Sequence, residues 1–412
     1  MNLSSIMSIF KNPYYRFASG YSFLFFITWS LWWSLYAIWL KNTIGLTGEQ
    51  LGTLYSLNQF TSITFMIIYG IVQDKLGLRK NLMWLLSVIL VLTGPFLIFF
   101  YEPYLKTHFY VVVTIGSVFF GLGYLAGCGL VDSFTEKMSR TFHFEYGTSR
   151  LWGSLGYAIG AFVAGLVFTI NPHINFWAVS VTGFLFMLMN YLFNVEKAQT
   201  YIPQKTKDLT KDDFIDVLKD KQFWIFVIFI IGTWSFYTIY DQQMFPVFYA
   251  GLFSTTELGT RVYGYLNSAQ VVIEAICMAL APFVINRIGP KKALLIATII
   301  MTCRILMAAW FVNPYIISFV KMFHALEVPL FVVAVFKYAV ANFDKRLSST
   351  IFLIGFQIAS SIGIILLSIP LGKIFDSFGY QKVFLIMSCV VAAMLVFGFA
   401  SLSNSRKIDK NT

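Results

Sequence analysis

Apolar runs of about 20 residues recur from one end of the chain to the other, and nothing in the sequence constrains the fold more. A helix needs roughly 20 apolar residues to cross the hydrocarbon core of a bilayer. The sequence is 58% apolar, and only 12% of its residues are charged, about half of the fraction that is typical of soluble domains. The composition therefore predicts an all-α membrane protein.

Twelve such runs can be placed along the chain. They are expected near residues 17–42, 49–72, 81–101, 108–134, 146–170, 174–194, 223–249, 262–286, 293–312, 315–341, 348–374 and 381–403. An even number of spans puts both termini on the same side of the membrane. The longest polar stretch separates six spans from six. We therefore expect an N-terminal six-helix bundle at 1–194, a cytoplasmic linker at 195–222, and a C-terminal six-helix bundle with a short tail at 223–412.

The basic residues other than Arg150, Arg304 and Lys321 lie in loops or near the ends of spans, and they are distributed unevenly between the two sides. The side of the termini holds 22 Lys and Arg residues, and the other side holds 5. Because cytoplasmic loops carry an excess of Lys and Arg, both termini are predicted to be cytoplasmic. The same rule explains the formal net charge of +11 without a nucleic-acid partner. The first apolar run is too long for the core of a signal peptide and is expected to remain as an anchor.

Three titratable residues, Lys321, His324 and Glu327, lie inside one apolar run. Residues three apart are neighbours on one face of a helix. A charge at the centre of a bilayer costs about 2.5–3.5 kcal/mol on insertion scales, and such groups face a cavity or a partner. The stripe predicts a polar cavity at mid-membrane depth that handles protons. A buried structural ion pair is the alternative interpretation.

A second constellation joins two neighbouring spans. Asp132 lies near the end of the fourth span and Arg150 near the start of the fifth, and a short loop connects them. Their helices are therefore expected to be antiparallel neighbours whose side chains can meet. A carboxylate and a guanidinium offer the acceptors and directed donors that sugar hydroxyls need. A pair that only locks two helices together is the alternative.

The two halves of the chain share a loop motif, and the chain as a whole resembles a known family. GIVQDKLGLRK begins at residue 70 and PFVINRIGPKK at residue 282, and repeated halves are a known transporter architecture. The first motif looks like the loop signature of the major facilitator superfamily. Through DKLGLRK, FHFEYG, YTIYDQQ, INRIG and KMFHALEVP, the chain resembles the oligosaccharide:proton symporters, the group of the lactose permeases. Within this group it is most similar to the bacterial sucrose-transporting branch, nearly end to end.

The resemblance implies a fold and a set of roles. The fold would be twelve transmembrane helices in two pseudo-symmetric six-helix bundles, with a sugar site at their interface near the bilayer midplane and alternating rocking of the bundles. Asp132 and Arg150 would be the principal sugar-binding groups. Tyr157 stands where lactose-transporting members carry a tryptophan, and its ring can pack on a pyranose. Trp29 and Trp33, four apart in the first span, would form a sugar wall or a packing stripe.

The proton site is expected in the C-terminal half. Burial raises the pKa of a carboxyl and a nearby cation lowers it, so a carboxyl whose distance from an arginine changes can load and release a proton. On this ground Glu327 is the expected coupling acid and Arg304 its trigger, roles that the resemblance also implies. His324 and Tyr237 are expected to share in proton coupling.

The charged and polar residues of the C-terminal half differ from the lactose-type pattern in two places. Positions 238 and 360, an acid and a lysine in that pattern, are Thr238 and Ser360 here. Asp241 is therefore expected to form a structural ion pair with Lys321, since a buried charge needs a partner. In the eighth span Val271 replaces the acid of the pattern, and Glu274 follows one turn later beside Gln270. Gln270, Glu274 and His324 are candidates for sugar binding. Glu274 is open to three roles: binding sugar, holding His324 or sharing in proton coupling.

The predicted function is symport of a disaccharide, expected to be sucrose, with protons across the bacterial cytoplasmic membrane. No cofactor or metal is expected, only the co-transported proton. The expected state is a multi-pass monomer in contact with membrane lipid. Another oligosaccharide, such as a galactoside or raffinose, and a sugar receptor without transport are the alternatives. An enzyme is not favoured, because neither a nucleophile–base set nor a metal cluster is visible, and the few specific binding groups disfavour a channel.

Overall fold

The structure is a computed structural model that describes residues 11–193, 217–343, 347 and 351–404. Every regular element within these residues is a helix, so the all-α prediction is confirmed. Residues 195–216 of the expected linker, residues 348–350 of the eleventh expected span and the end of the tail lie outside the described residues.

Ten helical runs among the described residues are long and apolar enough to cross a membrane. They are Pro13–Ile44, Asn81–Leu105, Phe109–Thr141, Tyr146–Val167, Pro172–Leu192, Lys221–Ala250, Thr256–Ile288, Pro290–Trp310, Pro314–Asn342 and Phe352–Ser401. The last run contains a kink at Gly379, where φ is 79°, and it covers the last two expected spans. The second expected span corresponds to α4 (Gly48–Leu76), a helix of 29 residues. Polar side chains interrupt its apolar stretch, so α4 is not one of the ten.

Three of these runs begin in the same way, with an asparagine followed by a proline. The asparagines are Asn12, Asn171 and Asn313, and each side chain accepts a hydrogen bond from a backbone N–H of the first turn. An asparagine side chain satisfies a donor that the helix leaves free. Proline at the first helical position has a suitable φ and loses no hydrogen bond. These local signals fix where the helices begin.

The chain forms two compact units. Unit 1 comprises Met1–Leu46, Leu57–Gln204 and Ser254–Val272, and unit 2 comprises Thr47–Ser56, Lys205–Phe253 and Ile273–Thr412. Two helices are divided between them: the first turns of α4 belong to unit 2, and the first half of α15 (Thr256–Ile288) belongs to unit 1. The division into bundles at the linker 195–222 stays a prediction.

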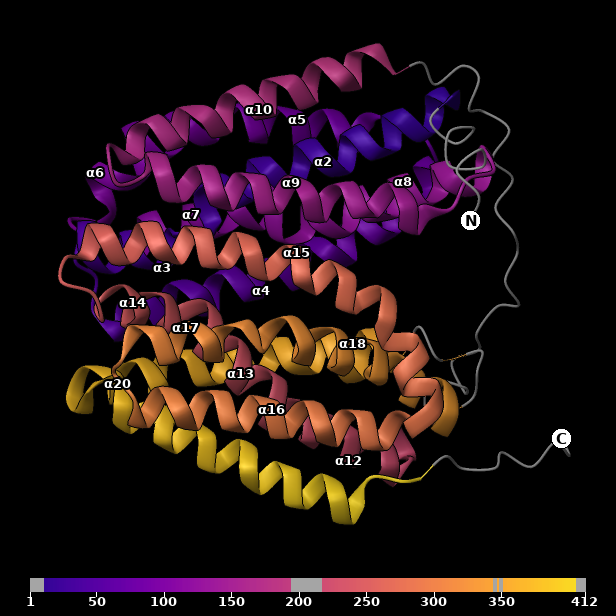
Figure 1. Ribbon diagram of the computed structural model, residues 1–412. Helices are drawn as coiled ribbons and strands as arrows, with labels where there is room; N and C mark the ends of the chain where they lie inside the picture. The colour runs from indigo at the N-terminus through magenta and orange to yellow at the C-terminus, as the bar shows by residue number, and fades with distance from the viewer. Residues whose placement is uncertain (1–10, 194–216, 344–346, 348–350, 405–412) are drawn as a thin grey trace, which may run out of the picture. The chain divides into compact units, whose positions relative to one another are not determined.

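Unit 1 is built from helices that run alongside one another (Figure 1). Besides its parts of α4 and α15, its helices are α2 (Pro13–Trp33), α3 (Tyr36–Ile38), α5 (Asn81–Pro95), α6 (Glu102–Leu105), α7 (Phe109–Phe120), α8 (Ala126–Thr141), α9 (Tyr146–Val167) and α10 (Pro172–Leu192). π-helical segments at Trp39–Ile44, Phe96–Tyr101 and Gly121–Leu125 join several of them. α2 packs against α8, α9 and α10.

Glycines set the closest approaches in unit 1. Gly153, Gly156 and Gly160 of α9 all lie against α2, where an added Cβ would meet Phe26, the backbone of Phe23 or Ser30. A Cβ added at Gly264 of α15 would lie 2.5 Å from the Cα of Gly165 of α9. Small residues allow helix backbones to approach this closely in membranes.

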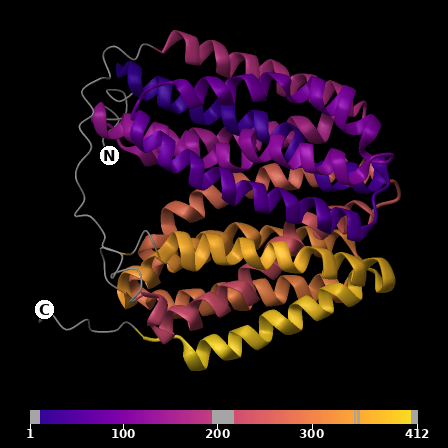
Figure 2. The ribbon, with the colours of Figure 1, turned by 180° about the vertical axis from the view of Figure 1, so that it is seen from behind.

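Unit 2 holds the remaining helices, which Figure 2 shows from behind. They are α12 (Lys221–Ile230), α13 (Phe236–Thr238), α14 (Phe245–Ala250), α16 (Pro290–Trp310), α17 (Pro314–Met322), α18 (His324–Asn342) and α20 (Ala359–Ser401). Its π-helical segments are Ile231–Ser235, Ile239–Met244 and Phe352–Ile358. α16 packs against both α18 and α20. The first turn of α4 is held here by Asp376, whose carboxylate accepts from the backbone N–H of Gly48 at 2.7 Å.

Candidate functional site

A buried polar cluster in unit 2 is centred on Arg304 of α16. This guanidinium is 1% exposed and forms ion pairs with Glu327 of α18 and, at 3.0 Å, with Asp241. It also donates a hydrogen bond of 2.7 Å to the hydroxyl of Tyr237. The predicted partners Arg304 and Glu327 therefore do meet. One cation serves two carboxylates, so the charges of the cluster are coupled to one another.

His324 belongs to the same cluster, with its Nδ1 3.4 Å from the Arg304 guanidinium. Its Nδ1 is 2.5 Å from the hydroxyl of Tyr237 and 3.2 Å from Oδ1 of Asp241. Its Nε2 is 3.6 Å from Oε2 of Glu274. The imidazole is thus bracketed by acidic groups at both of its nitrogens. Because each nitrogen can hold or release a proton, His324 can exchange protons in either direction.

The cluster leaves specific polar atoms unmatched. Oε2 of Glu327 and Nε of Arg304 are buried and have no hydrogen-bond partner among the described residues. A buried acceptor without a donor is costly, by about 1–3 kcal/mol or more for a charged group. A proton on Glu327 would lower that cost by removing the charge whenever Arg304 is not paired with it. The geometry therefore favours a carboxyl that changes its protonation state.

Irregular helix geometry positions these side chains. The stripe from Lys321 to Glu327 is not one unbroken helix: α17 ends at Met322 and α18 begins at His324. The expected tenth span is nevertheless present as one run over Pro314–Asn342, and only the turn residue Phe323 separates the two helices. Glu327 lies in the first turn of α18, where the positive end of the helix dipole favours an anion. On the facing run, π-helical segments flank Tyr237, and such segments are frequent at functional sites.

The ion pair expected between Asp241 and Lys321 stays a prediction. Asp241 has Arg304 and His324 as close partners, while the Lys321 ammonium lies 5.3 Å from the centre of the Phe245 ring. Lys321 is fully buried and close enough to act electrostatically on Asp241.

Unit 1 holds the second constellation. Nε of Arg150 on α9 lies 2.8 Å from Oδ1 of Asp132 on α8, and the two side chains are 29% and 30% exposed. The guanidinium also lies over the ring of Phe26, 4.0 Å from its centre. Tyr146 interacts with both charges. The predicted pair is formed, and it remains partly open, unlike the sealed cluster around Arg304.

A row of aromatic side chains on α2 begins at Phe26, beside the Asp132–Arg150 pair, and extends to Trp33. The ring centres of Phe26 and Trp29 are 5.8 Å apart, and those of Trp29 and Trp33 are 6.2 Å apart. Nε1 of Trp29 is buried and has no hydrogen-bond partner among the described residues. Tyr157 is seven residues beyond Arg150 on α9, so it lies on the same helix face. Sequence reasoning counted Phe26 among the aromatic residues of the first span without assigning it to the site, and it missed Tyr146, whose chemistry is ordinary for a span.

The remaining candidates lie on α15. Gln270 is 3% exposed and belongs to unit 1, and its Oε1 has no hydrogen-bond partner in the part of the chain that is described. Glu274, one turn later, belongs to unit 2 and approaches His324. Of the three roles left open for Glu274, this contact favours holding His324 or sharing in proton coupling. No group of His, Cys, Asp and Glu within the described ranges could hold a metal ion.

Comparisons with known proteins agree with this picture. Residues 7–411 match the family described as LacY proton/sugar symporter. The sucrose permease of Escherichia coli is 67% identical over 398 residues, which cover 97% of this chain and 96% of that protein. The melibiose permease of Enterobacter cloacae is 35% identical over 402 residues, 96% of this chain and 94% of the other.

A solved structure of the nucleoside transporter NupG shares the fold, with a TM-score of 0.78 and 17% identity over 95% of this chain and 99% of that one. At this identity the likeness concerns the fold alone. The family match and the permease relatives decide the class of protein. The chain belongs to the LacY proton/sugar symporter family and is a membrane transporter rather than an enzyme.

Proposed function

We propose that the protein carries sucrose together with protons across the bacterial cytoplasmic membrane, exposing its site to one side at a time. The observation that supports this proposal most is that one chain holds two buried or half-buried ion pairs that differ in their exposure to solvent. Asp132 and Arg150 form a partly open pair beside aromatic rings, whereas Arg304 and Glu327 form a sealed one. The 67% identity to a sucrose permease favours sucrose among the sugars.

Sugar binding is proposed for the open pair. Arg150 presents directed N–H donors and Asp132 presents acceptors, and sugar hydroxyls need both. Trp29, Trp33 and Tyr157 would pack on the apolar faces of the sugar rings. Gln270, Glu274 and His324 are proposed as further sugar contacts. The unmatched oxygen of Gln270 is available to accept from a hydroxyl.

Proton coupling is proposed for the sealed cluster. With Arg304 paired to Glu327, the carboxylate is held charged. When a conformational change separates the two, the desolvated carboxyl takes up a proton, and renewed pairing releases it. Tyr237 and His324 would pass the proton between this carboxyl and Glu274, since the Tyr237 hydroxyl contacts Nδ1 of His324 and a small movement would close the 3.6 Å between Nε2 of His324 and Glu274. The proton is the only co-substrate, and no cofactor is required.

The first test is proton movement. De-energised cells that express the protein should alkalinise a weakly buffered medium when sucrose is added, because each sugar enters with a proton. Glu327→Gln should abolish this signal and uphill accumulation in vesicles, while sucrose exchange across the membrane continues. Uphill, pH-driven accumulation in Glu327→Gln would refute the assignment of Glu327.

Another oligosaccharide is the second candidate, since a melibiose permease is a 35% identical relative. Competition of labelled sucrose uptake by lactose, raffinose, melibiose and maltose ranks these sugars. A receptor without transport predicts binding but no saturable uptake or counterflow. We further propose that both termini are cytoplasmic, because of the excess of basic residues on their side, and that the protein works as a monomer.

A further inference from the structure

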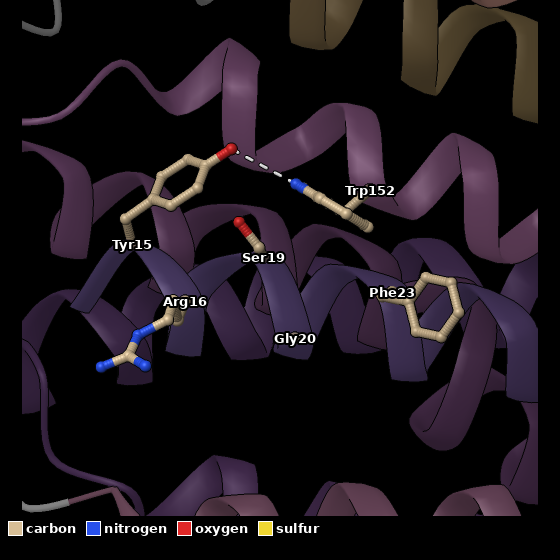
Figure 3. A pocket seen from close by; sticks show the side chains of 6 residues that line it. All are labelled: Tyr15, Arg16, Ser19, Gly20, Phe23 and Trp152. Atoms are coloured by element: carbon tan, nitrogen blue, oxygen red, sulfur yellow. Dashed lines mark hydrogen bonds between the residues drawn. The ribbon is translucent and has the colours of Figure 1, made fainter. Parts of the chain in front are cut away.

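A cavity of about 330 Å³ lies beside the first turns of α2, within unit 1. Tyr15, Arg16, Ser19, Gly20 and Phe23 of α2 line it together with Trp152 of α9 (Figure 3). None of these residues belongs to the proposed sugar or proton sites. The volume is at the low end of the range for small-ligand sites, so the cavity can hold part of an elongated molecule.

The lining changes from charged to apolar along α2. Arg16 and Phe23 lie at opposite ends of the row (Figure 3), and Arg16 is exposed. The start of α2 lies against the start of α9, because the Tyr15 hydroxyl donates to the carbonyl of Thr148 at 3.4 Å. Arg16 is therefore at the end of two spans, where Arg, Trp and Tyr meet lipid headgroups. Phe23 lies about two turns further along α2, so it is expected at the depth of the acyl chains.

Ser19 supplies an independent sign of a ligand. Its side chain lines the cavity and is 7% exposed. Its hydroxyl has no hydrogen-bond partner among the described residues. The neighbouring polar groups are engaged with each other, since Nε1 of Trp152 donates to the Tyr15 hydroxyl at 3.2 Å. A buried hydroxyl without a partner is unfavourable, and a rotation of the Ser19 side chain toward the cavity would let a ligand oxygen satisfy it.

We propose that this cavity binds an anionic phospholipid. The phosphate pairs with Arg16, an ester oxygen accepts a hydrogen bond from Ser19, and the start of an acyl chain packs on Phe23 and Trp152. Arg16 is the one charged residue among the six that line the cavity, and none of the six is acidic, so its guanidinium favours an anion at that end of a largely apolar cavity. Basic pockets between transmembrane helices are known to bind anionic headgroups. Free phosphate has no apolar part to cover the deeper end, which is why a lipid is the expected occupant.

Trp152 serves as the reporter for the test. The full-length protein is reconstituted in phosphatidylcholine vesicles with increasing fractions of phosphatidylglycerol that carries bromine on its acyl chains and quenches tryptophan on contact. The fluorescence of Trp152 is obtained by subtracting the tryptophan fluorescence of the Trp152→Phe variant from that of the wild type. The expected result is about five-fold stronger apparent binding of brominated phosphatidylglycerol than of brominated phosphatidylcholine, from one basic residue. Arg16→Gln should remove this preference. Arg287→Gln, which removes an exposed positive charge at the end of α15, should keep it.

Other outcomes overturn the proposal. Equal quenching by the two lipids, or a preference that survives in Arg16→Gln, would mean that Trp152 meets only bulk membrane lipid. Quenching that appears only after deletion of residues 1–10 would mean that the protein's own N-terminal segment occupies the cavity. Ser19→Ala keeps the shape of the site and should weaken the binding of phosphatidylglycerol without abolishing the preference.

Discussion

Arg304 is shared by two carboxylates, and this makes it more important for stability than either of its partners. Removing Glu327 leaves Arg304 paired with Asp241 and hydrogen-bonded to Tyr237. Removing Arg304 takes the closest cation from the buried Glu327 and leaves Asp241 with His324 and Lys321 only, and breaking a buried pair in this way costs about 3–5 kcal/mol. The two substitutions are therefore not equivalent, although each breaks the same ion pair.

We predict that Arg304→Gln lowers the apparent Tm of the purified protein by several degrees more than Glu327→Gln does. Lowering the pH should raise the Tm of Arg304→Gln more than that of the wild type, since protonation removes the unpaired charges. Arg140→Gln is the control, because its ion pair with Glu136 is exposed and worth about 1 kcal/mol or less. Equal losses in the two cluster variants would contradict the shared role of Arg304.

The open pair allows a sharper test of sugar recognition. Arg150→Lys keeps the charge but loses the planar fork that contacts Asp132 and stacks on Phe26. Arg and Lys are not interchangeable at a bidentate or stacked site. We expect the apparent affinity for sucrose to fall about ten-fold or more, measured by transport KM and by protection from unfolding. Arg140→Lys, in the last turn of α8 where Arg140 pairs with Glu136 instead, should change neither value.

At the scale of elements, glycine contacts decide which helices can meet. Gly264 and Gly165 let α15 and α9 touch backbone to backbone, and no side chain fits between them. Gly264→Ala would push the two helices apart, and overpacking of this kind costs about 1–3 kcal/mol. We expect a Tm lower by a few degrees and a changed transport rate. Gly70→Ala, where an added Cβ meets nothing within 4 Å, should be neutral or slightly stabilising and serves as the control.

Some features of the elements and the site could be predicted from the sequence, and others could not. Arg304, Glu327, Asp132 and Arg150 stood out because a charge inside an apolar run is costly and needs a reason. The pairing of Asp241 with Arg304 and His324 depends on how three separate helices pack, which spacing along one helix does not specify. The break before His324 and the π-helical segments beside Tyr237 are likewise set by tertiary contacts.

At the scale of the whole molecule, charge decides orientation. The 22 basic residues on the side of the termini exceed the 5 on the other side so strongly that no single substitution should invert the chain. We expect a fluorescent protein fused after Thr412 to be bright and alkaline phosphatase fused there to be inactive. Phosphatase fused after Phe253, between α14 and α15, should be active, because this loop is predicted to face outward. A fusion after Arg79 is the internal control and should be inactive. Active phosphatase after Thr412 with none after Phe253 would reverse the orientation, and Arg16 would then lie at the outer end of α2.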